Sequence, residues 1–379
     1  MCRKVRYTLE LLGDRLLVSA EIPCLAGEEP PEVTLHARAG VRSRSKRCRG
    51  AESFLVIVYD TPVEGWLNIL TEECFAVSLY SHAFPQGLPA YIDGSTCYFQ
   101  SGFESYDIVD AYIDRETGLW AKDTNVFFGE SANIAGVKRG NLRFIQKGIV
   151  KVFYTKEASY GNLYESAAIG EEAFAFYNKM YTPKEESVFK WLVLDIGDSS
   201  MYNRGNLVVA GGAPEDFCMP ENVPEDFPFS ESEYRLWLRY MLAHEVAHMW
   251  FCHADVDSYE DWLNETGAEW SAMMFLLERG DTGMFSLFYS LREYEHKTIG
   301  EAIMPEDKHH PASVHSSGVV LFYMLYKKYG ANMVRKLLVI LSKPENQSTD
   351  RFLSVVEKEL GSEISGFVEA HLREKLPLL

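Results

Sequence analysis

The sequence has little positive charge, since its 379 residues include 37 lysines and arginines against 55 aspartates and glutamates. The net charge of −18 argues against a nucleic-acid or anionic-membrane partner, because phosphate groups would be repelled. No apolar run approaches the roughly 20 residues needed to span a bilayer, and the N-terminus lacks the continuous apolar segment of a secretory signal. We therefore expect a cytoplasmic protein with no nucleic-acid or membrane partner.

Closely spaced cysteines are also missing. The seven cysteines are odd in number and widely separated, and no Cys-x-x-Cys pair occurs. This distribution indicates neither a disulfide framework nor a thiolate zinc site, and it favours a reducing compartment.

One segment breaks the acidic composition of the chain. Residues 41–50, VRSRSKRCRG, hold five basic side chains in ten positions. We expect a solvated loop here, because runs of like charge are usually solvated, and a contact patch is the alternative.

The first 145 residues are expected to form an antiparallel β domain. They contain short runs rich in valine, isoleucine, leucine and aromatics, broken by glycine, proline and aspartate. Two of the expected strands flank Gly13 and Asp14, and the segment EVTLHARA at 32–39 is another.

The second expected domain covers residues 146–379, which makes the predicted fold class α+β. From 146 to 212, strand-like and helix-like segments alternate, which predicts a small mixed sheet with a covering helix. A proline-rich acidic loop is expected at 213–229, and amphipathic helical patterns continue from 230 to 379.

The motif HEVAH lies on the first of these later helices, which a capping box from Ser230 to Glu233 is expected to begin. His244 and His248 are one turn apart on one face, so their ring nitrogens can reach the same metal ion. Glu245 lies about 100° around the helix from His244, where it can act as a general base on water but does not ligate. The alternative is a pair of half-buried histidines on an amphipathic helix.

A third ligand is available in DWLNETGAEW at 261–270. Glu265 lies seventeen residues after His248, and a connection of that length can return the chain to the histidines. Three nitrogen and oxygen ligands with an open fourth position favour one zinc ion. Glu269 shares the helix face of Glu265, so it is expected either to accept the outer N–H of a ligand histidine or to face solvent.

The residues HEVAHMWF followed by WLNE resemble the zinc aminopeptidase N family, whose catalytic domain is thermolysin-like. The resemblance runs from about residue 147 to the C-terminus, and VKVFYTKE, EEAFAFYNKMY and WLVLDIG carry it before the zinc helix. It implies a gluzincin metallopeptidase in which Glu245 activates water and the substrate is a peptide. Because the chain ends at Leu379, we do not expect the large C-terminal domain of many relatives.

Two departures from the family pattern concern the ligand spacing and the substrate-binding strand. The family usually has eighteen residues between its second histidine and its ligand glutamate, whereas sixteen separate His248 from Glu265, as after a loop deletion. The glutamate that binds the substrate amine in the family's Gly-x-Met-Glu-Asn edge strand aligns with Tyr202 in SMYNRGNLVV or with Glu215 in GAPED. We favour Tyr202, because Pro214 removes a backbone donor that an edge strand needs.

The third departure concerns the tyrosine that steadies the tetrahedral intermediate in the family. That tyrosine normally precedes a glycine by three residues, and here His315 precedes Gly318. A protonated imidazole can donate a hydrogen bond to an oxyanion, so catalysis can persist with a different pH dependence. The alternative is that His315 is an ordinary residue at the start of a helix.

The sequence therefore predicts a zinc-dependent metallopeptidase that is related to aminopeptidases but has altered specificity. The altered edge strand and His315 motivate a second hypothesis, a catalytically weak or inactive zinc-fold protein that binds peptides. A third hypothesis is hydrolysis of another small molecule at the same metal, since a fold does not fix a substrate.

Overall fold

The computed structural model describes residues 3–25, 27–64, 68–78, 84–88, 92–109, 112–113, 120–125, 133–155, 160–184, 188–194, 201–204, 207–211, 219, 222–256, 258–299 and 301–373. The chain forms two compact units. The β unit comprises Met1–Ile145, Lys151–Ala158 and Phe189–Ala213, and the helical unit comprises Gln146–Val150, Ser159–Val188 and Pro214–Leu379. Most of the small mixed sheet groups with the β unit, and the expected domain boundary after residue 145 stays a prediction.

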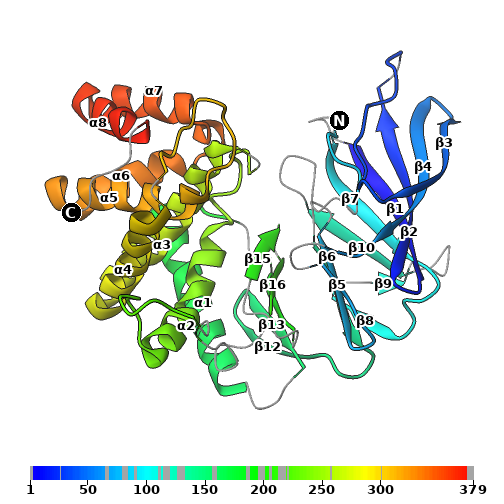
Figure 1. Cartoon of the computed structure of the whole chain (residues 1–379), viewed down its shortest axis with the longest axis horizontal. Coiled ribbons are helices and arrows are strands. Elements are labelled where there is room, and N and C mark those ends of the chain that lie inside the picture. Colours follow the sequence, from blue (N-terminus) through cyan, green and yellow to red (C-terminus); the bar gives the residue numbers. More distant parts are fainter. Residues whose placement is uncertain are drawn as a thin grey trace. The chain divides into compact units, whose positions relative to one another are not determined.

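The described strands up to Lys138 form two large sheets (Figure 1). The first has the order β3-β4-β2-β1-β7-β10-β9, with β1 Arg3–Leu12, β2 Arg15–Cys24, β3 Gly40–Arg49, β4 Glu52–Pro62, β7 Ile92–Phe99, β9 Tyr112–Ile113 and β10 Trp120–Asn125. The second has the order β5-β6-β11-β8, with β5 Ile69–Leu70, β6 Cys74–Ser78, β8 Tyr106–Ile108 and β11 Asn133–Lys138. The strand pairs are antiparallel as predicted, and the parallel pair β1/β7 is an exception.

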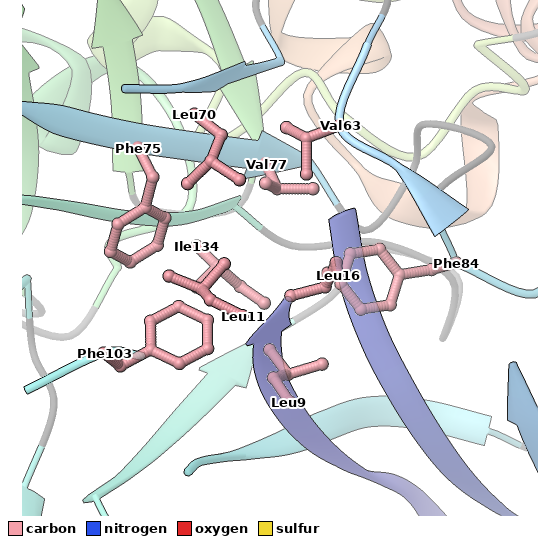
Figure 2. Close-up of a pocket in the computed structure, with 10 residues that line it drawn as sticks. All are labelled: Leu9, Leu11, Leu16, Val63, Leu70, Phe75, Val77, Phe84, Phe103 and Ile134. Carbon is pink, nitrogen blue, oxygen red and sulfur yellow. The ribbon is translucent and has the colours of Figure 1, made fainter. Parts of the chain in front are cut away.

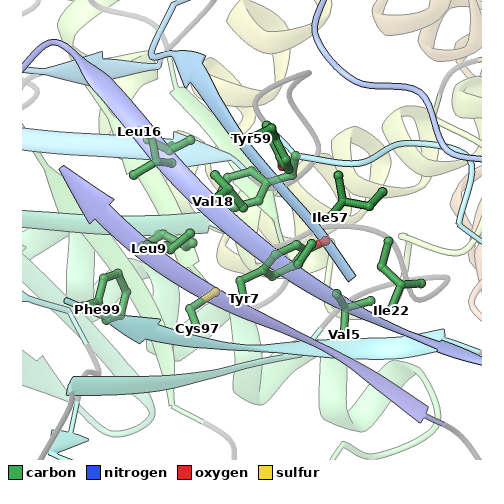
Figure 3. Close-up of a cluster of buried hydrophobic side chains, with 14 of the residues drawn as sticks. Val5, Tyr7, Leu9, Leu16, Val18, Ile22, Ile57, Tyr59, Cys97 and Phe99 are labelled. Atoms are coloured by element: carbon green, nitrogen blue, oxygen red, sulfur yellow. The ribbon is translucent and has the colours of Figure 1, made fainter. Parts of the chain in front are cut away.

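Alternation of apolar and polar residues explains the first hairpin. Strands β1 and β2 pair on either side of Gly13, whose φ of 65° suits a tight turn. Val5, Tyr7 and Leu9 of β1 point inward, each 1% exposed, and the residues between them face outward. Figure 3 shows these side chains packed with residues of β2, β4 and β7. The period of two therefore assigns one face of the sheet to the core.

One buried apolar cluster of the β unit lies between its two large sheets. Phe75 from β6 stacks edge-to-face on Phe103 and Tyr106, with ring centroids 5.3 and 5.1 Å apart. A small pocket remains between the sheets, and its lining is wholly apolar (Figure 2): Leu9, Leu11, Leu16, Val63, Leu70, Phe75, Val77, Phe84, Phe103 and Ile134. Because the described residues that line this pocket bring no polar group to it, we assign it to the packing between the two sheets.

Two predictions for the β unit were wrong. The basic segment 41–50 is not a loop, since most of it belongs to β3, an edge strand whose residues are all exposed. The backbone edge of β4 supplies hydrogen-bond partners for it, and charged side chains are well tolerated on an edge strand. The segment 32–39 is not a strand either, because Thr34 makes only an isolated bridge to Gln86.

A third sheet has the order β12-β13-β14-β16-β15, with β12 Arg143–Lys147, β13 Val150–Tyr154, β14 Phe189–Val193, β15 Met201–Arg204 and β16 Leu207–Ala210. It is mixed, as predicted, because β14 runs parallel and β15 antiparallel to β16. The segment that carries Tyr202 is an edge strand, with Tyr202 opposite Val209. The competing residue Glu215 lies outside the described residues.

The described helices of the helical unit are α1 Tyr160–Met180, α2 Glu231–Ala247, α3 Trp262–Arg279, α4 Thr282–Ile299, α5 Ser317–Tyr329, α6 Ala331–Leu341, α7 Thr349–Leu360 and α8 Ser362–Leu372 (Figure 1). Short 3-10 turns occur at Tyr259–Asp261, Ala312–His315 and Pro344–Asn346. Gly280 and Gly330 end α3 and α5 as predicted, with φ of 75° and 78°. No helix in the described ranges is long and apolar enough to cross a membrane.

Helix α3 lies at the centre of the helical unit. It packs against α2, α4, α5 and α6, and both Trp262 and Trp270 are completely buried. Glycines allow its neighbours to approach closely. Gly267 of α3 lies against the ring of Phe251, and Gly318 of α5 lies against Thr266. This close packing fixes the position of the buried side chains of α3.

Replacement of Gly318 by alanine should destabilise the protein by about 1–3 kcal/mol, as overpacking of a filled core does. A Cβ there would overlap the hydroxyl of the buried Thr266 and lie 3.2 Å from the ring of Trp262. Gly366→Ala is the control, because a Cβ at that exposed site in α8 meets nothing within 4 Å. Thermal and urea unfolding would measure the free energy of unfolding of both variants and of the wild type. The same free energy of unfolding for Gly318→Ala and Gly366→Ala would contradict the packing argument.

Candidate metal centre

Helix α2 presents the HEVAH motif from a well-defined start. The predicted capping box is present, because Ser230 accepts from the backbone N–H of Glu233, and the Glu233 carboxylate accepts from the N–H of Ser230. The far end of α2 is buried, with His244 3% and Glu245 5% exposed. The hydroxyl of Tyr177 on α1 donates to the carbonyl of Ala243 and thereby supports this end.

Side-chain amides organise the connection from α2 to α3. Gln347 accepts from the backbone N–H groups of Cys252 and His253, and it donates to the carbonyl of Trp250. Asn264 accepts from the N–H of Ala254 and donates to its carbonyl. These bonds satisfy backbone groups of Trp250, Cys252, His253 and Ala254 in the connection that leads to Glu265.

Three ligand atoms converge from the two helices. The Nε2 atoms of His244 and His248 are 3.1 Å apart. The Glu265 carboxylate lies 3.5 Å from Nε2 of His244 and 3.8 Å from Nε2 of His248. Ligands of a tetrahedral zinc ion with bonds near 2.05 Å are about 3.3 Å apart. The three side chains therefore fit a zinc ion, and all their ligand atoms lie within 4.8 Å of one another.

The outer ring nitrogens decide which atoms are free to bind a metal. Nδ1 of His248 is 2.9 Å from the carbonyl oxygen of Phe251, which only accepts, so Nδ1 carries the proton. Nδ1 of His244 faces the Glu269 carboxylate at 3.6 Å, which also only accepts. Both Nε2 lone pairs then point at a carboxylate and at each other. Such a cluster of electron pairs is stabilised by a cation.

The structure places His315 beside the ligand glutamate. Its Nδ1 is 3.0 Å from a carboxylate oxygen of Glu265, and half of its side chain is exposed. Desolvation would lower the pKa of His315, but the Glu265 carboxylate outweighs it and raises the pKa to about 9. Burial would likewise raise the pKa of Glu265, yet His315, His248 and His244 hold it well below its usual range. Glu265 is thus a carboxylate, and a bound cation would compete with His315 for it.

Glu269 is completely buried, so the alternative of a solvent-facing acid was wrong. Sequence reasoning missed Arg292 of α4, whose guanidinium forms an ion pair with Glu269. It also missed His310, whose Nε2 lies 3.2 Å from the carboxylate of Asp261, next to the start of α3. The histidines of KHHPASVH offered a signal for His310, whereas nothing in the local sequence distinguishes Arg292 from a surface arginine.

Comparison with known proteins finds similar solved structures. No family model matches the sequence, and no curated protein does. Among solved structures, native yeast leukotriene A4 hydrolase superposes with a TM-score of 0.66 at 12% identity, covering 99% of this chain and 68% of that one. A second structure of the native enzyme, from Saccharomyces cerevisiae, gives 0.63 at 14% identity over the same shares.

An aminopeptidase N family protein from Idiomarina loihiensis superposes with a TM-score of 0.60 at 11% identity, covering 99% of this chain and 77% of that one. This chain shares their fold. The predicted resemblance is therefore confirmed for the architecture, an α+β fold shared with these leukotriene A4 hydrolase and aminopeptidase N family structures. At identities this low, the likeness does not extend to activity, and the roles of the site residues remain predictions.

Zinc should raise the unfolding temperature of the metal-free protein, because a ligand of the native state stabilises it by about 2.7 kcal/mol at one hundred times its Kd. Glu265→Gln should lose most of this shift, since a neutral amide replaces the charged ligand. Glu278→Gln, at the exposed far end of α3, should keep it. Calorimetry with zinc and with a chelator would test this, and equal shifts in both variants would contradict the ligand assignment.

Proposed function

We propose that this chain is a zinc-dependent metallopeptidase. The convergence of His244, His248 and Glu265 is the observation that carries the proposal, and the metallopeptidase-like fold supports it. The proposed substrate is a peptide, and the reaction is hydrolysis of a peptide bond.

Zinc, when bound by His244, His248 and Glu265, supplies a Lewis acid that polarises a carbonyl group and lowers the pKa of water. Glu245 is the proposed general base. It neighbours His244 on α2 and is 5% exposed. Few solvent molecules therefore surround its carboxylate, and it can exchange a proton directly with the attacking water. It takes a proton from the attacking water and delivers it to the leaving amine.

His315 is the proposed donor to the oxyanion. Its Nδ1 contacts Glu265, and its ring is half exposed, so the other nitrogen, Nε2, is available to donate a hydrogen bond. Nδ1 of His315 already contacts Glu265, so Nε2 can donate only when it also carries a proton. The donor is therefore the protonated, positively charged ring.

The specificity is proposed to differ from that of aminopeptidases. Tyr202 stands at the position where the family's amine-binding glutamate is expected, and a phenol does not neutralise a substrate ammonium group. We therefore propose that peptides with blocked amino termini are accepted as readily as free ones. If Glu215 supplied the anchor instead, free amino termini would be preferred.

Glu245→Gln should retain zinc and lose peptide hydrolysis by a factor of about 10²–10⁴, because the amide cannot take a proton. Metal analysis and turnover of a peptide library, with free and blocked amino termini, would measure both. Glu278→Gln is again the matched control and should keep wild-type activity. Undiminished hydrolysis by Glu245→Gln would remove this residue from the mechanism.

His315→Ala should lower kcat, whereas His315→Tyr should restore part of it, because a phenol also donates a hydrogen bond. If the protonated imidazole is the donor, wild-type kcat falls as the pH rises through the pKa of His315. A tyrosine keeps its proton to higher pH than an imidazole does, so kcat of the His315→Tyr variant should begin to fall at a higher pH. A pH–rate profile of the three proteins would show this, and identical profiles would argue against the role.

A non-catalytic peptide-binding protein is the second candidate. The pairing of His315 with Glu265 favours it, because a protonated His315 competes with a cation for this carboxylate. Peptide binding without cleavage by the zinc-loaded protein would establish this candidate. Sustained turnover that a chelator abolishes would dismiss it.

A further inference from the structure

Glu269 and Arg292 form an ion pair beside His244, one of the proposed metal ligands. Glu269 on α3 is 0% exposed and Arg292 on α4 is 9% exposed, and their charged groups are in direct contact. A second carboxylate, that of Glu295, accepts from Nη1 of Arg292 at 3.1 and 2.8 Å. Buried charges are retained only when they are paired, so Arg292 permits Glu269 to stay ionised in the interior.

The Glu269 carboxylate is directed at one of the two histidines. Its Oε1 lies 3.6 Å from Nδ1 of His244. Within the described part of the chain, this Nδ1 is buried and makes no hydrogen bond. The Glu269 carboxylate only accepts, so it favours a proton on this Nδ1, and such a proton leaves Nε2 free on the side of the other ligands.

The two histidines are held in different ways. The outer nitrogen of His248 bonds to the backbone carbonyl of Phe251, which no substitution of a side chain removes. The outer nitrogen of His244 depends on a carboxylate, and that carboxylate depends on a cation from another helix. Desolvation alone would lower the pKa of Arg292, but Glu269 and Glu295 raise it, so the guanidinium is permanently charged.

We propose that Arg292 is a positioning residue of the metal centre. By holding the Glu269 carboxylate against His244, it fixes the orientation and the tautomer of that ring, and it thereby raises the affinity of the site for zinc. The inference rests on the proposed function in assuming that zinc occupies this site, but it concerns metal affinity and not turnover. The competing role is a purely structural clamp between α3 and α4.

The test compares zinc affinities of the full chain, measured by competition with a chelator of known affinity. Arg292→Met and Glu269→Gln should each weaken zinc binding by about 10–100-fold, the usual effect of losing an outer-shell partner of a metal ligand. The double variant should lose no more than either single variant, because the two residues act as one unit.

Glu295→Gln is the matched control. It removes the other carboxylate that contacts Arg292 and leaves the contact with Glu269 intact, so its zinc affinity should equal that of the wild type. In the cobalt-substituted protein, the visible absorption bands report ligand geometry. These bands should change in Arg292→Met and stay unchanged in Glu295→Gln.

Thermal unfolding of the metal-free variants separates the two roles. A structural clamp would lower the unfolding temperature of Arg292→Met and leave its zinc affinity and cobalt spectrum unchanged, which would overturn the proposal. If Arg292→Met does not fold, the zinc affinity of the double variant, Arg292→Met with Glu269→Gln, decides between the two roles. This variant leaves no unpaired charge at position 269. Wild-type zinc affinity in that folded double variant would also overturn it.

The outcome for Arg292 can be told apart from the outcome for the proposed function. A wild type that binds zinc and cleaves no peptide refutes the peptidase, and the variant affinities still decide the role of Arg292. A wild type that binds no zinc refutes both proposals.

Discussion

The whole site depends on the burial of α3. A helix that is buried on nearly every side packs in the centre of its unit, and it can carry acidic residues there only if each is matched by a partner. Glu265 is matched by histidines and Glu269 by an arginine. The close contacts through Gly267 and Gly318 oppose rotation and sliding of α3, so packing positions its acidic side chains.

This arrangement concentrates charge in a place where the solvent cannot screen it. Within a few residues of the ligands lie Glu245, Asp261 and Glu269, all less than 10% exposed. The rest of the chain is strongly acidic as well, yet its surface charges are solvated and contribute little to stability. The chemistry of the site therefore follows from a few buried groups whose partners are fixed, and not from the net charge of the protein.

Local sequence signals predicted the elements well wherever one signal dominated. The alternation around Gly13, the capping box at Ser230 and the stops at Gly280 and Gly330 all appear in the structure as expected. The failures came where local signals and tertiary pairing disagree. The charge-rich segment 41–50 has no apolar face, but it forms a strand because its backbone pairs with the edge of β4. The segment 32–39 has the composition of a strand and pairs only at Thr34.

The sequence by itself determined that His244 and His248 share one face of a helix, because they are four residues apart, and it singled out Glu265 as their partner. Only the tertiary structure decided what surrounds them. The contacts of Arg292 with Glu269 and of His315 with Glu265 join residues on different helices and turns. Periodicity describes one helix at a time, whereas these contacts depend on how α3, α4 and the turn before α5 are packed together.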